Sequence, residues 1–166
     1  METLRIQPTQ REDVPAVMAI YDHARFFMRT HGNAAQWIDG YPSQELIIAE
    51  VEAGHSFVCK DEDNEIVGTF CYIEGNDPTY RKIYDGAWLD EEPYAVIHRM
   101  ASSGKRKGIG EACFRWALAH NAHIRVDTHA DNHVMQRLLA KLGFQRCGII
   151  FVSNGTPRIA YQNPSR

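Results

Sequence analysis

The sequence predicts a single domain of the α/β class, and three observations lead to that prediction. The chain has 166 residues, of which 44% are hydrophobic and 23% charged, a balance that suits one soluble domain with a substantial core. Residues 94–121 change from an apolar, β-branched segment to a basic glycine loop and then to helical spacing. An acidic turn at 61–64 and the pair Asn154-Gly155 indicate hairpins. We expect one domain over residues 1–166.

The first elements are a short strand over residues 4–7 and a helix with an apolar stripe. Thr9 and Glu12 have the spacing of a capping box ahead of that helix. Pro15 fits the first turn if the helix begins nearer Asp13, so two start positions remain open.

Next come a second helix and a pair of strands. The helix is expected over residues 43–53, after a loop of turn-forming residues. Residues 56–60 and 65–74 are predicted to pair as an antiparallel hairpin. The irregular segment 76–92 then leads to a fourth strand over residues 94–101.

The last third of the chain repeats the strand and helix alternation. Residues 124–128 form the fifth predicted strand, and Asp131 is a suitable N-cap for the helix that follows. Gly143 ends that helix, and residues 144–151 and 158–162 are predicted to pair as the final hairpin.

The basic glycine loop before residue 109 is the strongest functional signal. A helix start presents unpaired N–H groups and the positive end of the helix dipole, and Gly108 and Gly110 let an anion approach the backbone. Lys105, Arg106 and Lys107 add positive charge. The pattern therefore predicts a phosphate site, best filled by a diphosphate, and the alternative is a plain exposed turn.

Two known phosphate motifs do not fit this loop. A P-loop requires Lys where Ile109 stands, and a dinucleotide fingerprint requires a third glycine where Cys113 stands. Both classes are disfavoured.

Other chemistry is also disfavoured. The histidines near Asp127 suggest a metal site, but His129 and His133 straddle a predicted strand-to-helix turn rather than sharing one helical face. Ser102 and Ser103 lack the G-x-S-x-G context of a hydrolase nucleophile. The four cysteines are widely spaced and fall in apolar settings, so we expect buried thiols and no metal site.

The hexapeptide Lys105-Arg106-Lys107-Gly108-Ile109-Gly110 resembles the acetyl-CoA loop, [RQ]-x-x-G-x-[GA], of the GCN5-related N-acetyltransferases, with Lys105 in place of Arg or Gln. A second segment, IRVDTHADNHVMQRLLAKLGF at 124–144, resembles the strand, Asn, helix and Gly-Phe arrangement of the same family. Four of its residues match in spacing: Asn132, Met135, Gly143 and Phe144. The resemblance covers roughly residues 3–162.

This resemblance implies one mixed, mostly antiparallel, twisted sheet of about seven strands with about four helices, splayed between strands four and five. It also implies acetyl-CoA as co-substrate. The diphosphate is expected at the amides of Lys105, Arg106, Lys107, Gly108, Ile109 and Gly110. The pantetheine arm is expected along Met100, Ala101 and Ser102, with Asn132 on the cofactor side. The N–H of Met100 is expected to face the thioester carbonyl.

An acceptor amine is protonated at neutral pH and must lose a proton before it attacks a thioester. Asp127 matches the position where ribosomal-protein N-terminal acetyltransferases carry a glutamate base, and the alternative is a strand-end carboxylate. His98 is the second candidate, because strand alternation is expected to place it on the face of Met100. Leu139 stands where the family often has a tyrosine acid, so the thiolate is expected to leave unassisted or to take its proton from water or another side chain.

Three aromatic residues are candidates for substrate binding. Trp37 and Tyr41 lie in a region that borders the acceptor site of the resembling family, and the alternative is that they cover the end of the core. Tyr84 lies in the segment 76–92, which either lines an acceptor pocket or is purely structural.

The expected function is therefore transfer of an acetyl group from acetyl-CoA to a primary amine, carried by a small molecule or a peptide. The alternative is a non-catalytic acyl-CoA sensor or interaction module on the same fold. The net charge of −3 argues against a nucleic-acid partner. No stretch approaches the roughly 18 apolar residues that span a bilayer, so we expect no membrane partner and a cytoplasmic monomer or homodimer.

Overall fold

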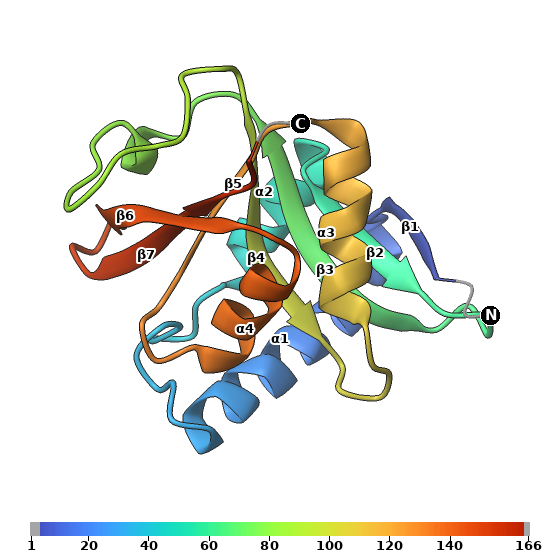
Figure 1. Ribbon diagram of the computed structural model, residues 1–166. Coiled ribbons are helices and arrows are strands. Elements are labelled where there is room, and N and C mark those ends of the chain that lie inside the picture. Colours follow the sequence, from blue (N-terminus) through green and yellow to red (C-terminus); the bar gives the residue numbers. More distant parts are fainter. Residues whose placement is uncertain (1–3, 165–166) are drawn as a thin grey trace.

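Seven strands form one sheet in the order β1-β2-β3-β4-β5-β7-β6 in the computed structural model, which describes residues 4–164 (Figure 1). Neighbouring strands are antiparallel except β4 and β5, which are parallel. The strands are β1 (Arg5–Pro8), β2 (Ser56–Lys60), β3 (Ile66–Glu74), β4 (Ala95–Ser102), β5 (Ile124–Thr128), β6 (Gln145–Phe151) and β7 (Pro157–Gln162). The predicted mixed, mostly antiparallel sheet is confirmed.

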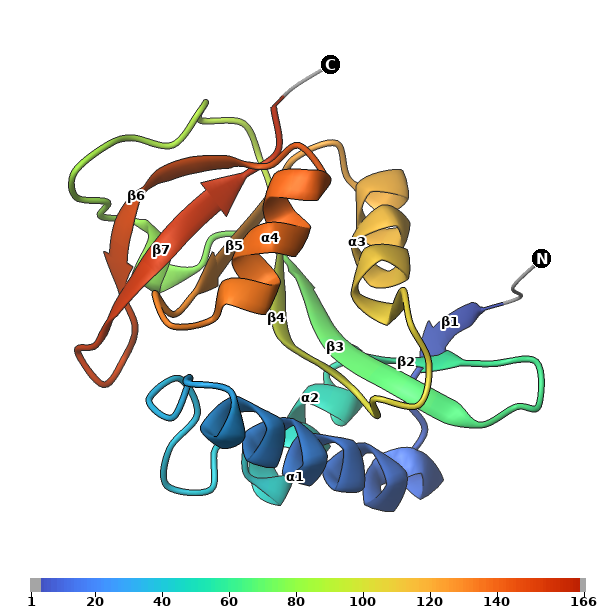
Figure 2. The same cartoon turned by 60° about the horizontal axis from the view of Figure 1, so that its bottom comes forward.

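Helices cover both faces of this sheet. Figure 2 shows α1 (Val14–Thr30) and α2 (Gln44–Glu52) on one face, and α3 (Ile109–His120) and α4 (His133–Lys141) on the other. The first face, with α1 and α2, is called the α1 face below, and the second the α3 face. Two 3-10 turns, η1 (Arg11–Asp13) and η2 (Pro78–Tyr80), complete the described elements.

Helix α1 begins at the later of the two predicted positions. Asp13 is its N-cap residue, and Pro15 lies in the first turn, where its missing N–H costs no hydrogen bond. The predicted capping box of Thr9 and Glu12 is wrong, because Gln10 N donates to Asp13 Oδ2 at 2.8 Å instead. The hydroxyl of Thr9 is buried against Ser56 Oγ, 2.8 Å away, and so is not available as a cap.

The predicted N-cap of α4 is displaced by one residue. Asn132, not Asp131, caps this helix, since its Oδ1 accepts a hydrogen bond from Met135 N at 3.0 Å. Gly143 follows the helix with φ +84, as expected of a glycine that ends a helix. Asn154 and Gly155 form the predicted turn between β6 and β7.

Each face of the sheet has its own core. On the α3 face, Phe70, Ile97, Phe114 and Leu139 belong to the largest buried cluster. On the α1 face, a second cluster packs α1 and α2 against β2 and β4, and a third cluster beneath the segment 76–92 contains Tyr80, Val96 and Ala160. The buried clusters fix the strands and helices that carry the site described below.

Strands β4 and β5 separate after a short paired stretch. Only Ala95 with Ile124 and Val96 with Arg125 pair, although both strands continue beyond these positions. The part of β4 from Ile97 onward therefore has no strand on its β5 side, and the predicted splay is confirmed.

A bulge at Arg99 reverses the alternation of side chains along β4. Arg99 has φ +54, and the register with β3 shifts at this point. Ile97 and Met100 consequently both pack on the α3 face, whereas Ala101 packs with the α1 face cluster. The expectation that His98 shares a face with Met100 is therefore wrong. His98 lies two residues from Val96 and shares the opposite face with it.

The four cysteines, at positions 59, 71, 113 and 147, are free and buried. Within the part of the chain that the structure describes, no helix is long and apolar enough to cross a bilayer.

Candidate active site

A cavity of about 580 Å³ opens where β4 and β5 separate. It is lined from both sheet faces, by residues of β4, β5 and β7 and by the loops around them. The predicted site residues on its wall are Trp37, Tyr41, His98, Met100, Asp127 and Asn132. The structure thus brings together candidates that are up to 95 residues apart in sequence, from position 37 to position 132.

The first turn of α3 forms one boundary of the site region. Gly108 is the N-cap residue with φ +80, and no side chain of the described residues caps this helix, whereas Ser43 caps α2 and Asn132 caps α4. The amide N–H groups of the first turn of α3 are therefore not used by a capping side chain. A Cβ at Gly108 would meet nothing within 4 Å, so the space in front of the helix is open to a ligand. This geometry fits a diphosphate.

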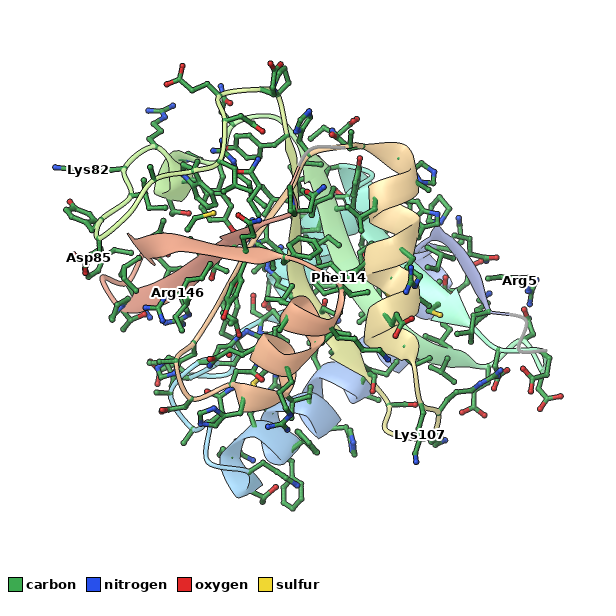
Figure 3. All side chains as sticks on the ribbon, viewed as in Figure 1. Arg5, Lys82, Asp85, Lys107, Phe114 and Arg146 are labelled. Carbon is green, nitrogen blue, oxygen red and sulfur yellow. The ribbon has the colours of Figure 1, made fainter. Side chains whose placement is uncertain are left out.

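The basic residues of the loop are partly neutralised by the acidic turn between β2 and β3. Lys105 Nζ lies 3.1 Å from Glu65 Oε2, and Arg106 bonds Glu62, which lowers the pKa of Glu62. Figure 3 shows Lys107 at the tip of the loop that leads into α3. The ion pair of Lys105 with Glu65 is exposed, so a polyanionic ligand can displace it at small cost, whereas the Arg106 side chain is mostly buried.

The free edge of β4 connects this loop to the cavity. Ser103 N donates to Val67 O at 3.0 Å, so the strand stays bound to β3 on its other side. Met100 contributes to the cavity wall, and a Cβ on Gly110 would lie 3.5 Å from its sulfur and 2.7 Å from Leu138 Cδ2. At Gly110, helix α3 therefore packs closely against Leu138 of α4 and touches Met100 of β4. An extended ligand arm can follow the unpaired strand edge towards the cavity.

Asp127 lies on β5, partly buried on the cavity wall. Tyr80 donates its hydroxyl proton to Asp127 Oδ2 at 2.6 Å. Burial raises the pKa of Asp127, although His98, the Tyr80 hydroxyl and Arg158 act in the opposite direction. A carboxylate with a raised pKa on a cavity wall has the chemistry of a general base.

His98 and Asp77 form a second ionisable pair on the same wall. His98 Nε2 lies 2.9 Å from Asp77 Oδ2. Burial works against ionisation of Asp77, but hydrogen bonds from His98 and Thr79 outweigh it and lower the pKa of Asp77 from 3.8 to about 2. Asp77 is therefore ionised at neutral pH and can accept a hydrogen bond from the N–H at Nε2 of His98. In this tautomer the other ring nitrogen, Nδ1, carries no proton and can act as a proton acceptor.

The α1 side of the cavity is built around the bulge in β4. Arg99 pairs with Glu50 at 3.0 Å and donates from Nε to the Tyr41 hydroxyl at 2.8 Å. Tyr21 donates its hydroxyl proton to Arg99 O at 2.9 Å and anchors the bulge. Trp37 lines the cavity and also packs on the α1 face cluster. Trp37 therefore lies at the cavity wall and at the edge of this core at the same time.

Asn132 has a structural role on the opposite wall. Besides capping α4, it donates from Nδ2 to Gln36 Oε1 at 3.0 Å. Arg158 donates from Nη2 to the backbone oxygen of Gln36 at 2.9 Å. The loop that carries Trp37 is thus fixed from two elements of the C-terminal half.

Tyr84 does not reach the cavity. It pairs through its backbone with Ile149, and its ring contacts Phe151 with the ring centres 5.4 Å apart. The loop before β4 instead contributes Asp77 and Thr79 to the cavity wall.

Sequence reasoning missed Asp77, Tyr80, Arg99 and Arg158. Asp77 is the only one with a local signal, since its Oδ1 accepts from Thr79 N in an Asx turn, and an Asp-Pro-Thr sequence is typical of such a turn. Arg99 and Arg158 line the cavity because of the bulge and the strand register, and Tyr80 reaches Asp127 from the 3-10 turn η2. None of these placements has a sequence signature of its own.

Within residues 4–164, no group of three or more histidine, cysteine, aspartate or glutamate residues is arranged to hold a metal ion. The histidines that suggested one are dispersed: His129 lies 3.6 Å from Asp131, and His123 lies 3.5 Å from Asp90.

An uncapped glycine-led helix start, a free strand edge and a cavity with ionisable groups together form a site that fits a phosphate-bearing ligand with an extended arm. The chain matches the sequence profile of the acetyltransferase (GNAT) family over residues 15–144. This protein belongs to the GNAT acetyltransferase family. The family membership supports acyl transfer from acetyl-CoA.

Solved structures agree with this assignment. A GNAT family acetyltransferase from Streptococcus agalactiae 2603 is 32% identical, with a TM-score of 0.86 over 98% of this chain and 96% of that one. A putative acetyltransferase from Staphylococcus aureus Mu50 is 22% identical, with a TM-score of 0.69 over 95% and 97% of the two chains. A chain of the NatC complex, solved with Gag peptide and CoA, is 13% identical, with a TM-score of 0.64 over 100% of both. No protein with a curated function matches the chain significantly.

Proposed function

We propose that this protein transfers an acetyl group from acetyl-CoA directly to a primary amine of a small molecule or a peptide. The observation that carries the proposal is the position of Asp127. It lies on the wall of a cavity that opens beside the free edge of β4, and that edge runs to the uncapped start of α3.

The cofactor-binding residues act in sequence along this path. The first-turn amides of α3, with Gly108 in front of them, bind the diphosphate, and Lys105, Arg106 and Lys107 supply positive charge. The edge of β4 from Met100 to Ser102 binds the pantetheine arm as an added strand would. The N–H of Met100 donates to the thioester oxygen, where negative charge develops during attack.

Asp127 removes a proton from the acceptor ammonium, directly or through a water molecule. The neutral amine then attacks the carbonyl carbon, a C–N bond forms, and the C–S bond breaks. The departing thiolate takes a proton from water, because Leu139 is buried in the α3 face cluster and supplies none. Trp37 and Tyr41 hold the acceptor from the α1 side of the cavity.

His98 is the alternative base, since the ionised Asp77 keeps its Nε2 protonated and leaves Nδ1 to accept a proton. It lies on the same cavity wall, and its electrostatic effect acts to lower the pKa of Asp127, which burial raises. Replacing Asp127 and replacing His98 should therefore change the pH dependence of kcat/KM in different ways.

The test compares Asp127→Asn with Asp131→Asn, using the amine that gives the fastest release of CoA thiol. Asp127→Asn should lower kcat/KM about 100-fold or more, and the loss should shrink as pH rises and more of the amine is neutral. Asp131 is outside the cavity lining, so Asp131→Asn should leave the rate unchanged. The Asp127→Asn protein should be at least as stable as the wild type at pH 7, because the native fold disfavours the ionised carboxyl.

Full activity of Asp127→Asn, together with inactivity of His98→Ala, would transfer the role of base to His98. A non-catalytic acyl-CoA sensor would instead bind acetyl-CoA and release no thiol with any amine.

A further inference from the structure

Arg158, on β7, is a buried cation with no carboxylate partner within residues 4–164. Its exposed fraction is 6%, and it lies on the wall of the cavity. Its guanidinium donates to Thr156 Oγ1 at 2.8 Å, to Pro157 O at 3.1 Å and to Gln36 O at 2.9 Å, all of them uncharged oxygens. Among residues 4–164 it forms no ion pair. Buried arginines without a compensating anion are rare because desolvation of the charge is costly.

In two other buried or half-buried arginines of this protein, the positive charge has a stabilising partner. Arg99, on the same cavity, is paired with Glu50. Arg125, outside it, lies between the rings of Trp88 and Tyr94, 4.3 and 4.0 Å from their centres. Arg158 has neither kind of partner among the described residues. An anion bound in the cavity would supply a negative charge beside Arg158.

Asp127 is not that anion. Its carboxylate accepts the short hydrogen bond from Tyr80 and has no ion pair with Arg158 among the described residues. Burial raises the pKa of Asp127, and the charge of Arg158, which acts in the opposite direction, does not offset it.

Arg158 lies on the acceptor side of the sheet, not the side of the glycine loop. Along β7, Ile159 and Tyr161 pack on the α3 face, and Ala160 packs with Tyr80 on the other face. Arg158 therefore faces the same way as Ala160. Asp127 pairs with Ala160, so Arg158 is its diagonal neighbour on one face, and diagonal neighbours are about 7–8 Å apart. A ligand anion at Arg158 thus belongs to a molecule whose amine lies near Asp127.

We propose that the acceptor carries a carboxylate close to its amine, as an amino acid does, and that Arg158 binds this carboxylate. The proposal rests on the proposed acetyl transfer and adds its substrate class. A planar guanidinium matches a carboxylate through parallel hydrogen bonds, and the low exposure of Arg158 strengthens this charge interaction. Arg158 then fixes the carboxylate while the amine points towards Asp127 and the thioester.

The test measures kcat/KM by CoA thiol release for the common amino acids, each paired with its carboxamide, which has the same amine and no charge. The wild type should prefer the carboxylates. Arg158→Gln should lower kcat/KM for the carboxylates at least about 100-fold and change it for the carboxamides less than about threefold. Arg146→Gln is the matched control, because Arg146 is exposed on the neighbouring strand β6 (Figure 3), and it should change neither.

Arg158 also holds the loop at Gln36, so a purely structural role predicts a different result: equal loss for carboxylates and carboxamides in Arg158→Gln. That result, or a wild-type preference for carboxamides, would overturn the proposal. If circular dichroism shows that Arg158→Gln does not fold, Arg158→Lys keeps the charge without the planar fork. It should reduce the carboxylate to carboxamide ratio about tenfold, and an unchanged ratio would overturn the proposal.

Calorimetry with the same pairs, in the presence of CoA, separates this proposal from the proposed function. If no amine is acetylated but carboxylates bind the wild type and not Arg158→Gln, the proposed function fails and the carboxylate site stands. If carboxylates and carboxamides bind equally, or neither binds, the carboxylate site is refuted.

Discussion

Replacing Gly108 with alanine should separate cofactor binding from stability. Gly108 has φ +80 and ψ 9, and a Cβ there would meet no atom within 4 Å. The only cost to the folded protein is then the left-handed backbone of a non-glycine residue, about 1 kcal/mol. For a chain of this size that corresponds to a fall in Tm of about 2–4 °C.

The effect of Gly108→Ala on acetyl-CoA binding should be larger than its effect on stability. The added methyl group stands in front of the first turn of α3, where the diphosphate must approach the amides. We expect the Kd measured by calorimetry to rise about tenfold or more, which corresponds to about 1.4 kcal/mol or more.

The chain offers a matched control in Gly54, which follows α2. It also has φ +80 and open space around its Cβ position, so Gly54→Ala carries the same backbone cost. Gly54→Ala should lower Tm by the same amount and leave the Kd unchanged. An unchanged Kd in Gly108→Ala, or an equal rise in both variants, would remove the loop from the cofactor site.

Two further predictions concern the acid-base groups of the cavity. Asp77→Asn should lower the free energy of unfolding by about 2 kcal/mol at pH 7, because the pKa of Asp77 is lowered from 3.8 to about 2 in the folded protein. This stabilisation is complete above the unfolded-state pKa and is lost as pH falls towards 2, so urea titrations should show the difference shrinking below about pH 4; a difference independent of pH would contradict the assignment. Tyr80→Phe removes a hydrogen bond that lowers the pKa of Asp127. The acid limb of kcat/KM should then move to higher pH, and a limb that stays in place would argue against Asp127 as the base.

The fold was predictable because local patterns and the family resemblance agree. The strand, glycine loop and helix of residues 94–121 and the turn at Asn154-Gly155 each have a clear local signal, and the structure confirms them. Both errors at helix starts are shifts of one residue: the sequence predicts the Thr9–Glu12 pair where Gln10 pairs with Asp13, and predicts Asp131 where Asn132 is the cap. Asp and Asn are both good N-cap residues, so local sequence does not separate Asp131 from Asn132.

The site was less predictable because it depends on contacts between distant segments. The bulge at Arg99 turns His98 and Met100 to opposite faces, and no residue type in β4 announces it. Tyr80 meets Asp127 from a position 47 residues away. Arg158 reads in the sequence as an ordinary charged strand residue, and only the tertiary structure shows that it is buried without an ion pair within residues 4–164.

The most direct test of the central claim is to incubate the wild-type protein with acetyl-CoA and a panel of amines. The release of CoA thiol is followed with time, and each amine is analysed by mass spectrometry for one added acetyl group. For at least one amine, we predict that CoA thiol is released in the same amount as an N-acetylated product is formed. The rate of this release should fall about 100-fold or more in Asp127→Asn. Tight binding of acetyl-CoA with no thiol release across the panel would contradict acetyl transfer and favour an acyl-CoA sensor.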